Sequence, residues 1–171
     1  SWATATKGGG FQLFGKNLAE VNNATDSRIH VDTIATRGSR QNLDLLEAGE
    51  VDVGHVEGNA ARIALEGLCI PGADLRVLSV MYPNPGMFVV RGDSAYQRIE
   101  DLKGQPIAFG TRASGLRILA NDVLDGLGLQ PEKDFKQIIL DKAADGPQLV
   151  LDGEAEALWG AGIGWPGFVA V

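Results

Sequence analysis

The sequence predicts an α/β fold built on parallel sheets. Short runs of β-branched and apolar residues alternate with longer segments in which apolar residues recur every three or four positions. Turns rich in glycine and serine separate the two kinds of segment. A repeated order of strand, turn and helix is typical of a parallel sheet that carries helices on its faces.

The first half of the chain contains the elements of one such sheet. Apolar or alternating runs predict strands over residues 2–6, 29–34, 51–56 and 75–81. Helical spacing predicts helices over residues 11–22, 39–48 and 60–68. The proline-rich sequence YPNPG at residues 82–86 then interrupts the pattern.

The second half of the chain repeats the pattern. We expect strands over residues 87–91, 106–109, 136–140 and 156–159, and helices over residues 115–126 and 144–152. A short echo links the halves, because TRGS at residues 36–39 and TRAS at residues 111–114 each precede a helix. The chain is therefore expected to form two α/β lobes, residues 1–86 and residues 87–171.

Composition narrows the function classes. The chain has 171 residues, 44% of them hydrophobic, which is enough for a packed core. A formal net charge of -7 with scattered Lys and Arg argues against nucleic-acid binding. No apolar run has the roughly 18 residues needed to span a bilayer, so we expect no membrane insertion. The single cysteine, Cys69, lacks neighbouring metal ligands and is expected to be a buried packing residue.

Three loops place small residues at the start of an expected helix. They are KGGG at residues 7–10, TRGS at residues 36–39 and GTRASG at residues 110–115. Glycine permits close backbone approach, and the first N–H groups of a helix attract anions such as carboxylate or phosphate. The alternative is that Ser39 and Ser114 are ordinary helix N-caps and that Arg37, Arg112 and Arg117 are merely solvated.

The sequence lacks the motifs of nucleotide binding and of common catalytic sites. Neither G-x-G-x-x-G nor the P-loop motif occurs, and Ser114 does not lie in a G-x-S-x-G elbow. His30 and His55 fall in expected strands, without a carboxylate at metal-ligand spacing. Glu57 follows an expected strand and could line a cleft. We therefore expect a protein that is not an enzyme and uses no cofactor or metal.

The order of these segments resembles the TAXI family, the extracytoplasmic solute receptors of TRAP transporters. The resemblance is carried by GGGFQLFG (residues 8–15), TRGSRQNLDLL (residues 36–46), GEVDVG (residues 49–54), YPNP (residues 82–85), DLKG (residues 101–104) and Ser114-Gly115. It implies a type II periplasmic-binding-protein-like fold with mixed, mostly parallel sheets. It also implies a periplasmic receptor that closes over a small carboxylate, often glutamate-like, and passes it to a membrane TRAP permease.

The same resemblance implies a ligand site. Phe11 and Tyr82 would form apolar walls, and Ser39 and Asn42 would make polar contacts. The carboxylate would bind Ser114 and Gly115. The remaining members of the implied ligand-binding set are Gly9 and Glu57.

The sequence departs from the family pattern at several of these positions. Family members usually have Gly in place of Arg37, Gln in place of Glu57 and Thr in place of Leu116. They also have Tyr-Tyr-Pro at residues 11–13 and Glu in place of Asn84. An acid at residue 57 and an arginine at residue 37 would change the preferred charge of the ligand.

The end of the sequence, residues 161–171, resembles a segment in the middle of family members. We therefore expect the second lobe to be incomplete at its C-terminus, which leaves oligomerisation or strand exchange open.

Two other functions share this fold. Some phosphoribosyltransferases and pyrrole-assembling transferases contain a segment similar to residues 49–54, but Cys69 would be the only candidate cofactor anchor. A ligand-sensing domain of a regulator is the third reading, and it would need a fused DNA-binding or kinase segment.

Overall fold

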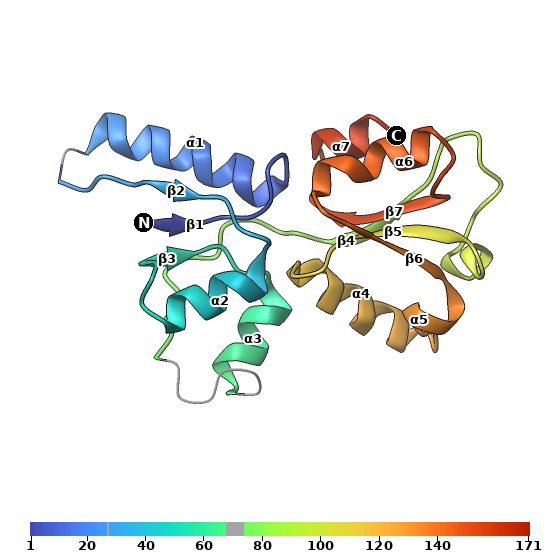
Figure 1. Cartoon of the computed structure of the whole chain (residues 1–171), viewed down its shortest axis with the longest axis horizontal. Helices are drawn as coiled ribbons and strands as arrows, with labels where there is room; N and C mark the ends of the chain where they lie inside the picture. The colour runs from blue at the N-terminus through green and yellow to red at the C-terminus, as the bar shows by residue number, and fades with distance from the viewer. Residues whose placement is uncertain (27, 68–73) are drawn as a thin grey trace. The chain divides into compact units, whose positions relative to one another are not determined.

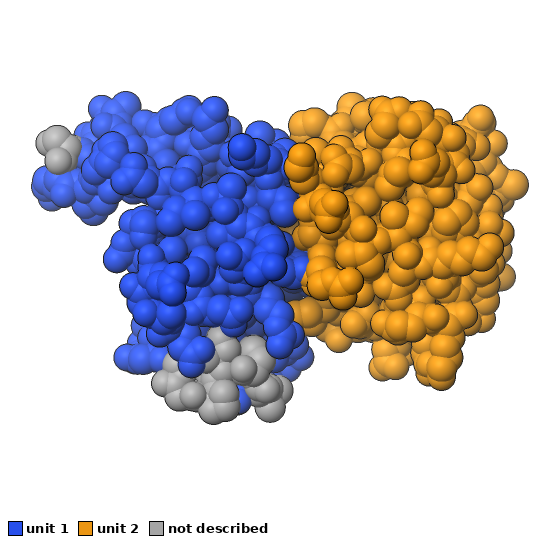
Figure 2. Space-filling view, viewed as in Figure 1, with its two compact units in different colours: residues 1–82, 113–115 blue, residues 83–112, 116–171 orange. Residues whose placement is uncertain are grey.

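A computed structural model describes residues 1–26, 28–67 and 74–171 (Figure 1). The chain forms two compact units (Figure 2). Unit 1 contains Ser1–Tyr82 together with Ala113–Gly115, and unit 2 contains Pro83–Arg112 and Leu116–Val171. The lobe boundary expected from the sequence lies after residue 86. The packing role expected for Cys69 and the predicted helix end at Leu68 lie outside the described residues.

Unit 1 is built on a parallel sheet. Its strands are β1 (Trp2–Ala3), β2 (Thr33–Ile34) and β3 (Val53–Gly54), in the order β2-β1-β3. Trp2 pairs with Thr33 on one side and with Val53 on the other. The strands are shorter than predicted, but the backbone bonds continue beyond them, for example from Thr4 N to Ile34 O at 2.9 Å.

Three helices follow the three strands of unit 1. They are α1 (Gly10–Thr25), α2 (Ser39–Glu47) and α3 (Gly58–Leu65). All three were predicted, with ends that differ by a few residues. α3 begins before the predicted residue 60 because the Glu57 side chain caps its first N–H groups.

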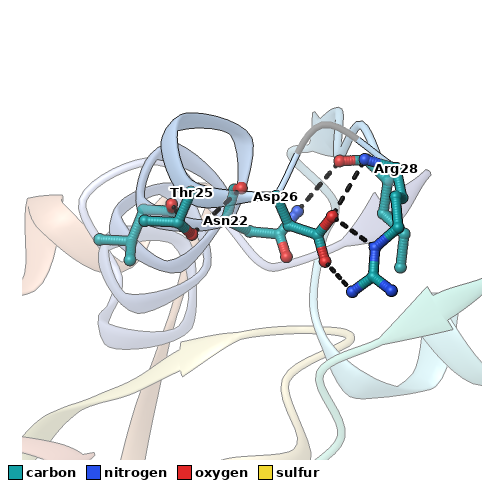
Figure 3. A network of polar contacts seen from close by, with 6 residues as sticks. Asn22, Thr25, Asp26 and Arg28 are labelled. Atoms are coloured by element: carbon teal, nitrogen blue, oxygen red, sulfur yellow. Dashed lines mark hydrogen bonds and ion pairs between the residues drawn. The ribbon is translucent and has the colours of Figure 1, made fainter.

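The C-terminal end of α1 is fixed by local polar contacts (Figure 3). Asp26 N donates to Asn22 O at 2.9 Å, and the Thr25 hydroxyl donates to Val21 O at 2.7 Å. Arg28 then binds both carboxylate oxygens of Asp26, at 2.9 Å and 2.8 Å. These hydrogen bonds hold the pKa of Asp26 below its usual value. The Arg28 side chain is exposed to solvent, and that of Asp26 is partly exposed.

The predicted strand over residues 75–81 is wrong. In the described part of the chain no strand pairs with this segment, which has no regular secondary structure and is mostly exposed. Val80, for example, is 86% exposed. The segment has strand-forming residues, but β propensity yields a strand only where a neighbouring strand supplies hydrogen bonds and packing.

Unit 2 is built on a mixed sheet. Its strands are β4 (Gly86–Val89), β5 (Pro106–Thr111), β6 (Lys136–Leu140) and β7 (Ala157–Ala161), in the order β4-β7-β5-β6. β5 runs parallel to β6 and β7, whereas β4 is antiparallel to β7. The predicted strand at residues 136–140 is confirmed at both ends.

Helices cover both faces of the unit 2 sheet (Figure 1). α4 (Gly115–Gly126) and α5 (Pro131–Asp134) cover one face, and α6 (Gly146–Leu151) and α7 (Pro166–Val169) cover the other. Short 3-10 turns occur at Ile99–Leu102 and Ala143–Asp145. α5 was not predicted, and it is a single short turn that starts with a proline.

The core of unit 2 follows from strand alternation. Ile107 and Phe109 on β5 pack with Leu124 of α4, whereas Ala108 packs with Val150 of α6 on the opposite face. Phe109 is 2% exposed, and burying such a side chain is worth about 1.5–3 kcal/mol. The predicted fold class, α/β with mixed and mostly parallel sheets in two lobes, is confirmed.

Candidate functional site

Buried polar side chains gather in unit 1 where the parallel strands end. Each of them comes after the carboxyl end of β1, β2 or β3, and the set is Thr4, Thr6, Thr36, Ser39, Asn42, His55 and Glu57. In parallel α/β sheets this edge is where ligands bind, because the loops that follow the strands meet there. Buried polar groups also cost free energy unless they are hydrogen-bonded, so their partners define what each residue does.

Asn42 is the centre of this cluster. It has no exposed surface, and its amide nitrogen donates to Thr4 O and to His55 O, both at 2.7 Å. Its amide oxygen accepts from the Thr36 hydroxyl at 2.6 Å. The side chain therefore ties the ends of all three strands together. The side-chain amide therefore already makes, within the protein, the hydrogen bonds that it would need for contact with a ligand.

Ser39 and Glu57 contact each other at the start of two helices. The Glu57 backbone N–H donates to the Ser39 hydroxyl at 3.0 Å. The Glu57 carboxylate oxygen Oε2 accepts from Asn59 N at 3.0 Å and from Ala60 N at 3.2 Å, so Glu57 is the N-cap of α3. Ser39 is the first residue of α2, and the N-cap is Gly38. The alternative that Ser39 is an ordinary N-cap is therefore wrong.

The turn at Ala113–Gly115 packs onto this pair within unit 1. Arg40 N, in the first turn of α2, donates to Ala113 O at 3.3 Å. A Cβ atom on Gly115 would lie 2.6 Å from both Ser39 Oγ and Glu57 Cβ, so only glycine fits there. A side chain on Gly38, whose φ is +126°, would meet Ala113 O at 2.9 Å. Both glycines are required by close packing.

A second group surrounds the start of α1. Gly9 is its N-cap, and Gly9 N donates to Thr6 O at 3.0 Å. The ring of Phe11 lies 6.3 Å from that of Tyr82, centroid to centroid, and Phe14 lies 5.2 Å from Tyr82. Burial raises the pKa of the Tyr82 phenol. Phe11 and Tyr82, which were expected at one site, thus pack against each other, and Gly9 lies two residues before Phe11.

All eight residues expected at the site lie in unit 1. Ser39, Glu57 and Gly115 touch one another, and half-buried Ser114 adjoins them in the same turn. Asn42, in the same helix as Ser39, is fully buried.

Sequence reasoning gave no role to His55, which lies just after β3 and is 2% exposed. Its Nδ1 lies 3.1 Å from Phe11 O, and burial lowers its pKa. His30 is not in a strand as predicted; it is exposed, and its Nε2 lies 3.3 Å from Asp32 Oδ1. One signal could have revealed His55. Gly15 sits inside a helix, where glycine is unfavourable, because a Cβ there would lie 2.6 Å from Thr4 Cγ2 and 2.9 Å from His55 Cε1.

Two further features bear on the class of site. Across residues 1–26, 28–67 and 74–171, no group of His, Cys, Asp and Glu side chains is arranged to hold a metal ion. None of the helices described is long and apolar enough to cross a membrane.

The two α/β units and the polar cluster at the strand ends define a periplasmic-binding-protein-like fold. The model of the NMT1-like family matches residues 2–164. The chain therefore belongs to the NMT1-like family. The finer resemblance to the TAXI receptors stays a prediction.

Solved structures with this fold bind different solutes. The periplasmic aliphatic sulphonate binding protein SsuA of Escherichia coli is 21% identical with a TM-score of 0.57, and the match covers 92% of this chain and 49% of that one. The cysteine-binding protein of Campylobacter jejuni is 13% identical with a TM-score of 0.58, over 94% of this chain and 62% of that one. The chain thus spans about half the length of the sulphonate-binding protein.

A regulator also shares the fold. The regulatory domain of CcmR from Synechocystis PCC6803, in complex with 2-PG, is 14% identical with a TM-score of 0.62, and the match covers 94% of this chain and 70% of that one. At these identities the likenesses show the fold alone.

Proposed function

We propose that this protein is a periplasmic solute-binding receptor that captures a small carboxylate and delivers it to a TRAP-type permease. The observation that carries the proposal is the contact of Ser39, Glu57 and Gly115 at the carboxyl ends of the unit 1 strands. Membership of the NMT1-like family and the similarity to periplasmic binding proteins support a receptor without catalysis.

The ligand carboxylate would bind at the start of α2. There, Arg40 N already donates to an oxygen of the chain itself, Ala113 O. A carboxylate in place of that neutral carbonyl would form a charge-assisted hydrogen bond, which is roughly twice as strong. The Ser39 and Ser114 hydroxyls would supply further donors. The proposed apolar walls are Phe11 and Tyr82, with Gly9 allowing close approach at the start of α1.

Glu57 would select the rest of the ligand. The residue is 8% exposed, and its carboxylate caps α3 through Oε2, but a carboxylate can accept about four hydrogen bonds in total. A negative charge beside the site favours a ligand that also carries an ammonium group and disfavours a second carboxylate. A glutamate-like amino acid is therefore the proposed ligand, in preference to a dicarboxylic acid.

Isothermal titration calorimetry tests the ligand class. The panel contains glutamate, glutamine, 2-oxoglutarate, succinate, methanesulfonate and phosphate, with the purified 171-residue chain. We expect saturable binding of glutamate or glutamine. Ser39→Ala should weaken that binding by about 1.5–3 kcal/mol, the value of one hydrogen bond to a charged group. If the chain binds none of these acids, the proposal is contradicted.

Glu57→Gln tests the selection by charge. The variant keeps an acceptor for the α3 N–H groups but removes the negative charge, so succinate should gain affinity relative to glutamate. A matched change at exposed Glu66, Glu66→Gln, should leave the ratio of the two affinities unchanged. An unchanged ratio in Glu57→Gln would show that Glu57 only caps α3.

The similarity to the CcmR regulatory domain favours a second candidate, a ligand-sensing domain of a regulator. The two candidates differ in where the native protein resides. Cell fractionation should place a receptor in the periplasm and a regulator in the cytoplasm. A cytoplasmic protein that binds a small acid would support the second candidate.

A further inference from the structure

His55, like Asn42, bonds to three different elements of unit 1. Its backbone N donates to Ala3 O of β1 at 2.9 Å, and its carbonyl accepts from Asn42 of α2 at 2.7 Å. Its ring Nδ1 lies 3.1 Å from Phe11 O, in the first turn of α1. The ring therefore connects the end of β3 to the beginning of α1.

The chain is shaped to hold this ring. His55 lies between three aromatic rings, with centroids 5.0 Å from Trp2, 5.4 Å from Phe11 and 5.8 Å from Phe14. Gly15 lacks a Cβ at the point where one would lie 2.9 Å from His55 Cε1 and 2.6 Å from Thr4 Cγ2, so both side chains occupy that space. An aliphatic residue could fill such a space, so the polar ring calls for another explanation.

The contacts fix the protonation state of the ring. A carbonyl oxygen only accepts, so Nδ1 carries a proton and donates it to Phe11 O. Nε2 has no hydrogen-bond partner among the described residues, and neither has the neighbouring Trp2 Nε1. A second proton on the ring would place a charge, and a donor without an acceptor, inside an aromatic cluster.

The charged groups near His55 are engaged elsewhere. Glu57 binds the start of α3, and Asp52 binds the Ser1 ammonium group at 2.6 Å. On α1, Lys16 lies 3.8 Å from Glu20 on the exposed face. The titratable group on the far side of Phe11 and Phe14 is Tyr82.

We infer that His55 is a positioning residue for the candidate site: the neutral ring packs against Trp2, Phe11 and Phe14 and holds the first turn of α1 in place. A second proton, on Nε2, leaves the bond to Phe11 O intact but puts a charge inside the aromatic cluster, which drives the ring out and releases that turn. Burial disfavours the charged ring more strongly than the bond to Phe11 O favours it, which lowers the pKa of His55. The consequence for a ligand rests on the proposed function. Gly9 and Phe11 belong to the released turn, so acid should weaken binding.

Nuclear magnetic resonance tests the inference without a ligand. The chain has two histidines, and His30→Gln assigns the two imidazole Cε1–H signals. We expect the His55 signal to titrate at a lower pH in the folded chain than in concentrated urea. The backbone amide signals of residues 9–12 should shift with the same midpoint. A His55 midpoint equal to or above that in urea would overturn the inference, since it would show that the aromatic rings accommodate the cation.

Two variants separate the hydrogen bond from the volume of the ring. His55→Asn places an amide donor where Nδ1 lies, whereas His55→Leu fills part of the space without a donor. We expect the amide signals of residues 9–12 to remain near their wild-type positions in His55→Asn and to move in His55→Leu. In both variants the signals should no longer depend on pH. If neither variant folds, the titration of the wild-type chain still tests the inference.

Glutamate binding tests whether protonation of His55 affects the candidate site. In the wild-type chain the dissociation constant should rise about tenfold for each pH unit below the His55 midpoint, and His55→Asn should remove this dependence. If no acid binds at any pH, the proposed function fails, while the titration of residues 9–12 still tests the role of His55. Binding that is independent of pH, beside a confirmed His55 titration, would overturn the link between His55 and the site.

Discussion

Replacing Asn42 by alanine separates a structural role from a ligand contact. The change removes two donors and one acceptor from the interior, with bonds of 2.7 Å to Thr4 O, 2.7 Å to His55 O and 2.6 Å to Thr36 Oγ1. The fourth contact, to Ala3 O at 3.5 Å, is too long to count. Each of the three bonds contributes about 0.5–1.5 kcal/mol net, and their partners would be left buried. The expected loss in the free energy of unfolding is about 2–4 kcal/mol.

Urea unfolding followed by circular dichroism measures this loss. Arg40→Ala is the matched control, because Arg40 is exposed on the same helix and should change the free energy of unfolding by less than about 0.5 kcal/mol. The reasoning is refuted if Asn42→Ala is as stable as the control and loses only ligand binding. That result would assign the Asn42 amide to the ligand, as the family resemblance implies.

Two other changes follow from the same unit. Gly115→Ala places a Cβ 2.6 Å from Ser39 Oγ and from Glu57 Cβ, so overpacking should lower the free energy of unfolding by about 1–3 kcal/mol. The control is Gly58→Ala, where a Cβ meets open space and the free energy of unfolding should not change in the same urea experiment. Acid should destabilise unit 1, because burial puts the pKa of His55 below its ordinary value of 6.5 and the unfolded chain then binds more protons. This contribution to stability is complete above pH 6.5 and is lost as the pH falls through the folded pKa of His55. Melting temperatures of the wild type and of His55→Asn at several pH values measure it. The same dependence of melting temperature on pH in both proteins would contradict the prediction.

The sequence predicted well those elements whose pattern is local. Apolar spacing located α1, α2 and α4, and alternation located β6 at Lys136–Leu140. Residues 75–81 have an equally good strand pattern, but a strand also needs a partner, which no sequence window contains. α5 escaped prediction because a helix of one turn shows no period.

The residues predicted for the ligand site stay a prediction, but the structure shows contacts among them that the sequence did not indicate. Glycine and serine turns identified Ser39, Gly115 and Gly9, since such residues mark the loops after strands. The role of Asn42 could not be read, because its partners Thr4 and His55 are separated from it by 38 and 13 residues. A ligand-binding asparagine and a structural one look alike until those carbonyl groups are placed.

The glycine in the GTRASG turn illustrates how one residue type serves two purposes. The sequence suggested that Gly115 lets an anion approach the backbone, whereas the structure uses the missing Cβ to seat the turn on Ser39 and Glu57. The two uses compete, because Ala113 O occupies a donor, Arg40 N, that a ligand carboxylate would need. Similarly, the Glu57 carboxylate occupies the first N–H groups of α3. In the proposed receptor, binding at α2 would therefore replace the carbonyl oxygen of Ala113 with an oxygen of the ligand. The affinity would be the gain from a charged acceptor minus the cost of unseating the turn, so we expect it to rise when the turn packs less tightly and to fall when Ser39 is lost.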